Sequence, residues 1–408
     1  MSRRLVIATL RLGLSLTLSI GLALGLVFGL VSGLGLGGRY AEARKPGLRH
    51  RLRAKLLLKF TTKAPSFSSQ RYGEVMDRGR LFYLGRGLWY EQGKYYMLRL
   101  KDMKRVVVRA PVQRFLLANR RMFPRAGSGG RLPAYSVIRL LYYDTTHQVA
   151  GILLGDRQYR LGGRVIYLHW DLKKKRITRA MVLAHRSARL SWISVKPVGY
   201  SPKRRVVYLQ VLKKIQAKLG GSKPLEASVI AVSRTRIKTL TTFRTRYSLS
   251  RGPFHDPARE RVLLVEYAER GSRPSGHLVD LVKGRRKRLA IPVVTYGVAF
   301  GADGKRIFAY SCQTGYVWAI DAKTGRRLQR KRVGSMGHAA GMIFKGTLLV
   351  ARNKGMHFLD AKTLNQWKYV PTKTWHSGFM HVQGTLVTPG RVFLRTSDLV
   401  RVIDFKKP

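Results

Sequence analysis

The chain has 408 residues, of which 45% are hydrophobic and 10% aromatic, so it is far too apolar for an intrinsically disordered protein. Lysine and arginine total 80 against 19 aspartate and glutamate, which gives a formal net charge of +61. Because self-repulsion on this scale destabilises a compact state, the composition predicts an anionic partner. Nucleic acid, anionic lipid, lipopolysaccharide and acidic polymers all carry such charge, and composition alone does not choose among them.

The N-terminus has the order of parts found in a signal peptide. Two arginines near the beginning of the chain are followed by an uncharged apolar run over residues 12–38 and then by an Ala-x-Ala site at residues 41–43. We predict cleavage after Ala43 and therefore a periplasmic or extracellular protein. An N-terminal membrane anchor is the alternative, since roughly 20 apolar residues suffice to cross a bilayer.

A four-strand pattern is clearest over residues 296–333. Strands are predicted at residues 297–300 and 306–310, in a third segment from Tyr316, and in a fourth segment after the following turn. The dipeptide Asp303-Gly304 separates the first two, and Asp-Gly between apolar strands is typical of a tight hairpin. The segment therefore reads as one antiparallel four-stranded unit.

The acidic residue that ends the third strand of this unit recurs along the chain. The recurrent turn positions are Asp102, Asp171, Ser233, Asp280, Asp321, Asp360 and Asp404. Their successive separations are 69, 62, 47, 41, 39 and 44 residues. These values converge on the length of a propeller blade, so the sequence predicts an all-β fold, a seven-bladed β-propeller of four-stranded blades with longer insertions in the first half.

The segment Tyr316–Gly325, in which an apolar strand closes on Asp-x-x-Thr-Gly, resembles the repeat of the YVTN and PQQ-type (quinoprotein-like) propeller superfamily. The resemblance is specific over residues 252–404. It implies a propeller fold rather than an activity. Quinone-dependent dehydrogenases share the repeat, but this sequence has neither an adjacent cysteine pair nor an evident cluster of calcium ligands, so no cofactor is predicted.

The two ends of the propeller are predicted to meet. Only four residues follow Asp404, which leaves no room for an outer strand in the last blade, and residues 55–60 read as a strand that supplies it. The predicted domains are a signal peptide or anchor over residues 1–43, a basic linker over 44–54 and a propeller over 55–408.

Two other structural readings stay open at this stage. A β-sandwich, or two smaller β-domains divided near Ser191, would also suit many short strands. Residues 112–122 read as a short amphipathic helix inserted between blades.

The sequence favours a noncatalytic protein over an enzyme. Six of the acidic residues occupy recurrent turns, and the others lack the paired spacing of a glycosidase or a calcium loop, so no metal site is predicted. Hydrolase, metalloprotease and phosphate-loop motifs are also missing from the sequence. The single cysteine, Cys312, follows a strand-like run and is read as a buried structural residue.

One ligand-binding site is nevertheless conceivable at the mouth of the central channel. Polar and aromatic residues precede the first strand of several repeats, where a propeller places loops of one face. These candidate ligand-binding residues are Arg251, Tyr296, His338, Trp375 and His376. An enzyme or small-molecule-binding propeller with its site there is the alternative function.

Basic residues gather at or just after the recurrent turns, on the strands expected to lie outermost. The candidate anion-binding residues are Lys173, Lys174, Lys175, Arg176, Arg285, Arg286, Lys287, Arg288, Arg326, Arg327, Arg330, Lys331 and Arg332. We call this set the basic rim. Lysine and arginine on outer strands also block edge-to-edge pairing, but that purpose does not require a net charge of +61.

These features predict an exported, monomeric, noncatalytic scaffold. Its rim would dock on anionic lipid, lipopolysaccharide or an acidic polymer, and its faces would be available to a protein partner. Export argues against nucleic acid as the target, and the sequence has no recognised nucleic-acid-binding motif.

Overall fold

A computed structural model gives the fold of the chain. It describes residues 58–59, 75–77, 80–83, 94–99, 104–119, 136–156, 164–185, 190–215, 225–245, 251–266, 275–291, 297–311, 314–334, 340–344, 346–352, 355–371, 384–388, 391–395 and 400–406. The chain divides into two compact units, Met1–Lys55 and Leu56–Pro408. All described residues belong to the second unit, which is almost entirely β.

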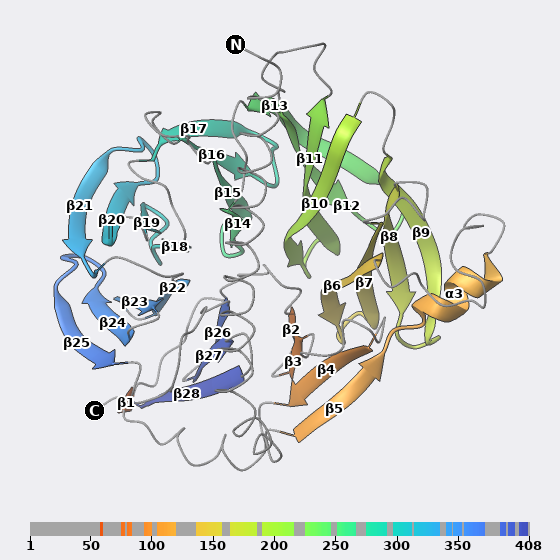
Figure 1. The fold of residues 1–408 in the computed structure, drawn as a ribbon, viewed down its shortest axis with the longest axis horizontal. Helices are drawn as coiled ribbons and strands as arrows, with labels where there is room; N and C mark the ends of the chain where they lie inside the picture. The colour runs from red at the N-terminus through yellow and green to blue at the C-terminus, as the bar shows by residue number, and fades with distance from the viewer. Residues whose placement is uncertain are drawn as a thin grey trace, which may run out of the picture. The chain divides into compact units, whose positions relative to one another are not determined.

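Consecutive strands from β2 to β25 form antiparallel sheets of four, each in chain order (Figure 1). The first three sheets comprise β2 (Val75–Asp77), β3 (Arg80–Tyr83), β4 (Lys94–Arg99) and β5 (Lys104–Arg109); β6 (Ser136–Asp144), β7 (Val149–Asp156), β8 (Arg164–Asp171) and β9 (Arg176–His185); and β10 (Leu190–Ser201), β11 (Val206–Ile215), β12 (Leu225–Val232) and β13 (Ile237–Thr245). The next three comprise β14 (Arg251–Asp256), β15 (Arg261–Val265), β16 (Ser275–Asp280) and β17 (Arg286–Ala290); β18 (Gly297–Phe300), β19 (Arg306–Tyr310), β20 (Tyr316–Asp321) and β21 (Arg327–Arg332); and β22 (Ala340–Phe344), β23 (Thr347–Arg352), β24 (Gly355–Asp360) and β25 (Gln366–Pro371).

The last sheet combines strands from both ends of the unit. The strands β26 (Gly384–Thr388), β27 (Arg391–Arg395) and β28 (Val400–Lys406) are antiparallel, and β1 (Leu58–Lys59) pairs in parallel with β28. The register places Leu58 opposite Phe405 and Lys59 opposite Lys406. A strand was predicted over residues 55–60, and this pairing puts it beside the last strand of the chain.

The unit predicted over residues 296–333 is confirmed at the level of its strands. The sheet β18–β21 begins and ends within a residue or two of the predicted positions, and the hairpin between β18 and β19 contains Asp303 and Gly304. Gly304 has a φ of +71°, a left-handed conformation that glycine adopts without steric cost. The Asp-Gly signal therefore identified the turn for the right physical reason.

The middle strands of the sheets from β6 to β25 are buried on both faces, which explains why they read as continuous apolar runs. In β15, Val262 and Leu264 pack into a cluster shared with sheet β10–β13. Leu263 and Val265 point the other way, into a cluster shared with sheet β18–β21. Successive side chains point to opposite faces of a strand, so a middle strand such as β15 packs against both neighbouring sheets.

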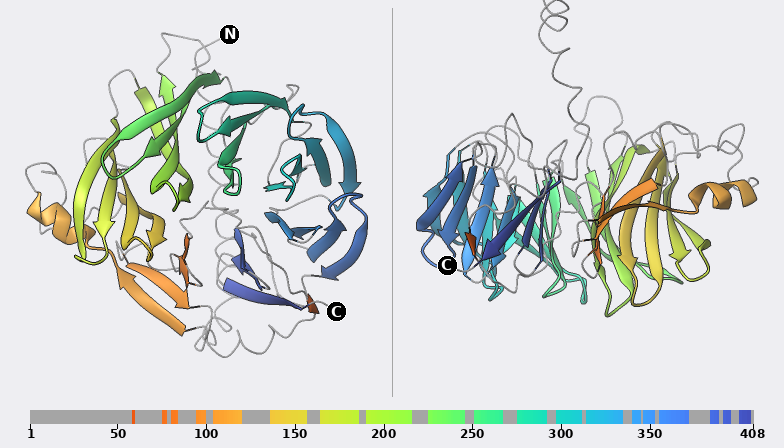
Figure 2. Two further views of the ribbon diagram at one scale, coloured as in Figure 1. Left: turned by 180° about the vertical axis from the view of Figure 1, so that it is seen from behind. Right: turned by 90° about the horizontal axis from the view of Figure 1, so that it is seen from below.

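The same arrangement repeats along the unit. Apolar clusters join sheet β6–β9 to β10–β13 and sheet β18–β21 to β22–β25. The first strands of successive sheets, from β2 through β26, also contact one another in chain order. Figures 1 and 2 show these first strands toward the middle of the unit and the fourth strands on its outside. Four-stranded antiparallel sheets that pack face to face in chain order have the architecture of β-propeller blades.

The alternative of two β-domains divided near Ser191 is wrong. Ser191 lies within β10, and a cluster of buried residues from both sides of this point contains Leu153 and Leu209. Residues 56–408 form one compact unit. The core is therefore continuous across the proposed boundary.

A short helix, α3 (Val112–Ala118), follows β5 and confirms the helix predicted in this region. Val112 and Leu116 are one helical turn apart and are both buried against sheet β6–β9. Asn119 ends the helix, with its side-chain amide donating to the carbonyl of Phe115 at 2.8 Å. The predicted residues 120–122 lie outside the described part.

Among the residues that the structure describes, no helix is both long enough and apolar enough to span a bilayer. The predicted signal peptide and basic linker, residues 1–54, lie outside those residues. The predictions of cleavage or anchoring and of location therefore stay predictions.

Candidate anion-binding surface

The fourth strands of the sheets carry the basic residues. Arg176 begins β9, residues 286–288 lie in β17, and residues 327–332 form β21. The other members of the basic rim lie in the turns that lead into these strands. The fourth strand of each sheet pairs with one neighbouring strand only and forms the outer edge of its sheet. Its polar side chains can therefore stay in water, although the inner strands of the same sheet pack between neighbouring sheets.

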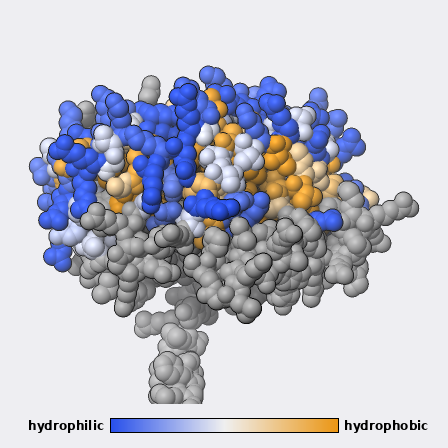
Figure 3. Space-filling model, turned by 90° about the horizontal axis from the view of Figure 1, so that it is seen from above, coloured by the Kyte–Doolittle hydropathy of each residue, from blue (hydrophilic) through white to orange (hydrophobic). Residues whose placement is uncertain are grey.

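The basic rim is exposed almost throughout. Each of its residues is exposed except Lys331, which is half-buried. In Figure 3, which views the molecule from above, hydrophilic side chains cover most of the described part of the face, with apolar residues showing between them. Exposed apolar side chains on the same strands include Val182 of β9 and Leu328 of β21.

Carboxylates do not neutralise this surface. Among the described residues, the ion pairs of arginine and lysine with carboxylates involve Glu226, Asp256 and Glu260, and none of their basic partners belongs to the basic rim. Within the described part of the chain, no carboxylate therefore forms an ion pair with a rim charge, although Lys287 donates to the carbonyl of Lys323 and Arg286 lies over the ring of Phe243. A surface of this kind favours any partner that presents several anionic groups.

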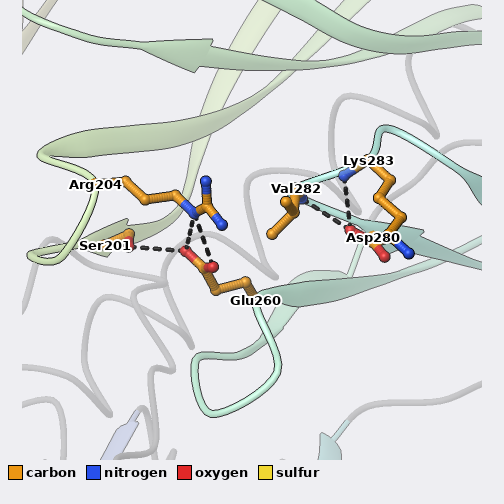
Figure 4. A network of polar contacts seen from close by, with 6 residues as sticks. All are labelled: Ser201, Arg204, Glu260, Asp280, Val282 and Lys283. Atoms are coloured by element: carbon orange, nitrogen blue, oxygen red, sulfur yellow. Dashed lines mark hydrogen bonds and ion pairs between the residues drawn. The ribbon is translucent and has the colours of Figure 1, made fainter.

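The recurrent aspartates have a structural role, as predicted. Oδ1 of Asp360 accepts hydrogen bonds from the backbone N–H of Lys362 and Thr363 at 2.9 and 2.8 Å. Asp280 makes the same contacts with Val282 and Lys283 (Figure 4). Each carboxylate thus satisfies backbone donors in the tight turn that leads to the outer strand.

These hydrogen bonds also change acidity. The backbone N–H of Thr363 lowers the pKa of Asp360, and this effect outweighs burial, which raises it. Backbone and hydroxyl hydrogen bonds from Thr324 likewise lower the pKa of Asp321. Asp321 and Asp360 therefore remain ionised at neutral pH while engaged in local structure.

Ser233 takes the aspartate's place in the sheet β10–β13. Its hydroxyl accepts the backbone N–H of Thr235 at 3.4 Å and of Arg236 at 3.2 Å. The substitution explains how this repeat keeps the turn although it lacks the acidic marker. Asp102 and the side chain of Asp404 lie outside the described residues.

A series of polar contacts connects neighbouring sheets at their first hairpin turns. Glu260, between β14 and β15, accepts from Nε of Arg204 at 2.8 and 3.0 Å and from Oγ of Ser201 at 2.8 Å (Figure 4). Arg204 and Ser201 belong to the preceding sheet. Burial raises the pKa of Glu260, but the hydrogen bonds from Arg204 and Ser201 outweigh it, so the pKa lies below its ordinary value.

The following sheets are connected in an equivalent way. Arg261 of β15 donates to the carbonyl of Gly304 at 2.8 Å, and Arg306 of β19 donates to the carbonyl of Ala361 at 3.0 Å. The guanidinium groups of these arginines hydrogen-bond to backbone carbonyls and so stabilise the contact between sheets. Such contacts are few in the described part of the basic rim, where Nζ of Lys287 donates to the carbonyl of Lys323.

A buried tyrosine cluster connects sheets β6–β9 and β10–β13. The rings of Tyr142 and Tyr200 stack with centroids 3.9 Å apart, and the hydroxyls of Tyr142 and Tyr167 are 2.7 Å apart. The hydroxyl of Tyr200 donates to Asp144 at 2.9 Å, and His147 contacts the same carboxylate at 2.7 Å. Burial raises the pKa of Tyr142 to about 12, so its hydroxyl remains protonated.

A second buried cluster contains a serine, a histidine and a glutamate but not the geometry of a hydrolase. Oγ of Ser275 donates to Glu266, and Nε2 of His277 lies 3.1 Å from the other carboxylate oxygen. Burial raises the pKa of Glu266, whereas His277, Ser275 and Thr245 lower it, and the result is about 2. Because Ser275 donates to Glu266 and not to His277, the histidine is not placed to take the serine proton as it would in a hydrolase triad.

The predicted channel-mouth site is not brought together within the described residues. Arg251 begins β14, with its backbone opposite Val265. Tyr296, His338, Trp375 and His376 lie outside the described part, as does Cys312. No group of three or more histidine, cysteine or acidic residues with the spacing of a metal site occurs among the residues that are described.

Sequence comparisons identify no family for this chain. No family model matches it, and no curated protein does. The YVTN and PQQ-type repeat resemblance therefore has no support from these comparisons.

Solved structures with a similar chain course are distant. AztD from Citrobacter koseri is 11% identical, with 73% of this chain and 71% of that chain covered and a TM-score of 0.41. Hsv2 from Kluyveromyces marxianus is 11% identical, with 82% and 90% covered and a TM-score of 0.46. BamB from Moraxella catarrhalis is 12% identical, with 84% and 98% covered and a TM-score of 0.44. At these values the fold assignment depends on the sheets of this chain alone.

Proposed function

We propose that this protein is an exported, noncatalytic β-propeller that docks on anionic envelope components through its basic rim. The partner would be anionic lipid, lipopolysaccharide or an acidic polymer, with the remaining surface available to a protein partner. The observation that carries the proposal is the exposure of nearly all rim residues on the outer strands β9, β17 and β21 and in the turns before them, without carboxylate ion pairs among the described residues.

The proposal includes a closed ring of seven blades. The pairing of Leu58 with Phe405 supports it, because β1 gives the last sheet the fourth strand that the other sheets have. Closure of this kind would cover the free edge of β28, and an uncovered strand edge is a site of aggregation. The repeat would then be of the YVTN and PQQ type that residues 316–325 resemble.

The physical argument for docking is electrostatic. A lysine or arginine near an anionic lipid surface contributes about 1 kcal/mol to binding, and several act together. Arginine also binds phosphate and carboxylate groups through two parallel hydrogen bonds. Positive charge spread over the outer strands of several sheets is thus suited to an extended anionic surface rather than to a single small ligand.

Paired lysine variants test the proposal. Lys173→Gln with Lys174→Gln removes two charges from the basic rim. Lys203→Gln with Lys305→Gln removes two exposed lysines from first hairpin turns and is the matched control. Binding of residues 44–408 to vesicles with 30% anionic lipid would be measured by sedimentation in low salt.

At about 1 kcal/mol per lysine, the rim variant should bind about thirtyfold more weakly than the unchanged protein. The control should differ from it by less than threefold. Equal losses in the two variants would mean that net charge alone drives binding, and the basic rim would then have no special role.

A further inference from the structure

Two aromatic residues of β20 lie under the outer strand of the same sheet. Tyr316 and Trp318 are two residues apart and therefore point to the same face of the strand. Trp318 is 7% exposed and packs into the cluster between sheets β14–β17 and β18–β21. Its ring is consequently held in place by the core.

Two arginines of β21 cover these rings. The guanidinium carbon of Arg327 lies 4.9 Å from the centroid of the Trp318 ring, and that of Arg330 lies 5.6 Å from the same ring. Arg330 is also 5.3 Å from the centroid of Tyr316. A cation within about 6 Å of an aromatic face is attracted to it, so both side chains are held in defined positions.

The arginine pair is positively charged, accessible and without a described counter-ion. Both residues are exposed. None of the carboxylates in the described ranges forms an ion pair with either guanidinium. Two guanidinium groups at one indole repel each other, and a bound anion with two or more charges would relieve that repulsion.

We infer that Arg327 and Arg330, positioned on Trp318, form a binding site for a phosphate group. The planar guanidinium fork can donate two parallel hydrogen bonds to phosphate oxygens, and fixing the side chains in advance reduces the entropy lost on binding. The inference names the chemical group that one part of the basic rim binds, and so it rests on the proposed function. The group can come from a lipid headgroup or from free phosphate.

A matched pair of variants separates this site from general charge. Arg327→Gln with Arg330→Gln removes the pair that lies on the rings. Arg326→Gln with Arg332→Gln removes two exposed arginines of the same segment, for which the structure gives no ring contact. Arg327→Lys with Arg330→Lys keeps the charge and loses the guanidinium fork. Circular dichroism and thermal melting would establish that all variants are folded.

Binding would be measured with inorganic phosphate by calorimetry and with vesicles containing phosphatidic acid by sedimentation. The variant without the ring-bound arginines should bind at least one of these probes about tenfold more weakly, and the lysine variant should also bind that probe more weakly. The Arg326 and Arg332 variant also loses two charges of the basic rim, so its vesicle binding should fall, but clearly less than that of the Arg327 and Arg330 variant, and its binding of inorganic phosphate should change by less than twofold. A loss confined to vesicles would identify a lipid headgroup as the ligand, and a loss confined to inorganic phosphate would identify the free ion.

Equal losses in the two glutamine variants, or no loss in either, would overturn the phosphate site. Salt-sensitive vesicle binding that persists in that case would leave the proposed function intact. Conversely, saturable phosphate binding that depends on Arg327 and Arg330, without vesicle binding, would keep the site and reject docking on lipid.

Discussion

The contact between Glu260 and the preceding sheet provides a quantitative test of how the sheets are held together. Glu260→Gln preserves the size of the side chain but removes the charge that accepts from Arg204 and Ser201. Hydrogen bonds to charged groups contribute about 1.5–3 kcal/mol in buried settings. The side chains of Glu260 and Arg204 are 21% and 42% exposed, so solvent screens the pair, and we expect a loss of about 1–2 kcal/mol at pH 7.

The loss should depend on pH in a defined direction. The pKa of Glu260 in the folded protein lies below its ordinary value of 4.5, so the folded state favours the ionised carboxylate. The stabilisation is therefore fully present above pH 4.5 and is lost as the pH falls through the folded-state pKa. The difference between the unchanged protein and Glu260→Gln should shrink below pH 4.5.

Urea denaturation at a series of pH values between 7 and 3 would measure this difference. A double-mutant cycle with Arg204→Gln should show favourable coupling between the two side chains at pH 7. A variant as stable as the unchanged protein at pH 7 would refute the reasoning. So would a loss that does not diminish as the carboxyl group is protonated.

Three other changes examine the packing, the recurrent turn and the N-terminal strand. Gly199→Ala would place a Cβ 2.1 Å from Nδ1 of His255, so unfolding should become easier by about 1–3 kcal/mol in a denaturant titration, unless the histidine can move away. Asp360→Ala removes the acceptor for the backbone N–H of Thr363 and should cost about 1 kcal/mol, whereas Asp360→Asn should cost less. Deletion of residues 44–62 should lower the melting temperature strongly by uncovering β28, and an unchanged melting temperature would argue against ring closure.

The sequence predicted the repeating architecture well because its signals are local. The Asp-Gly hairpin at Asp303, the apolar strands that follow it and the turn aspartate Asp321 all lie within about twenty residues of one another. The strands of sheet β18–β21 followed directly from these features. At Ser233 a hydroxyl replaces the aspartate as the acceptor, and the regular spacing of the turns located this position although it lacks the acidic residue.

Contacts between sheets could not be predicted in this way. Glu260 and Arg204 are 56 positions apart, and nothing in either local sequence indicates the other. The stacking of Tyr142 on Tyr200 spans a similar separation. A contact within one sheet was equally hard to predict. A β-bulge in the pairing of β20 with β21 sets the register that places Arg330 opposite Trp318. Each of these arrangements is decided by three-dimensional packing and not by periodicity.

The proposed docking function requires that the basic rim bind anionic surfaces by electrostatics. This requirement can be tested by measuring retention of residues 44–408 on vesicles with and without anionic phospholipid or lipopolysaccharide across a salt series. We expect retention only on the anionic vesicles and a steep decline as the ionic strength rises toward 0.5 M, where screening is strong. Retention that is independent of salt, or absent on every vesicle, would contradict it.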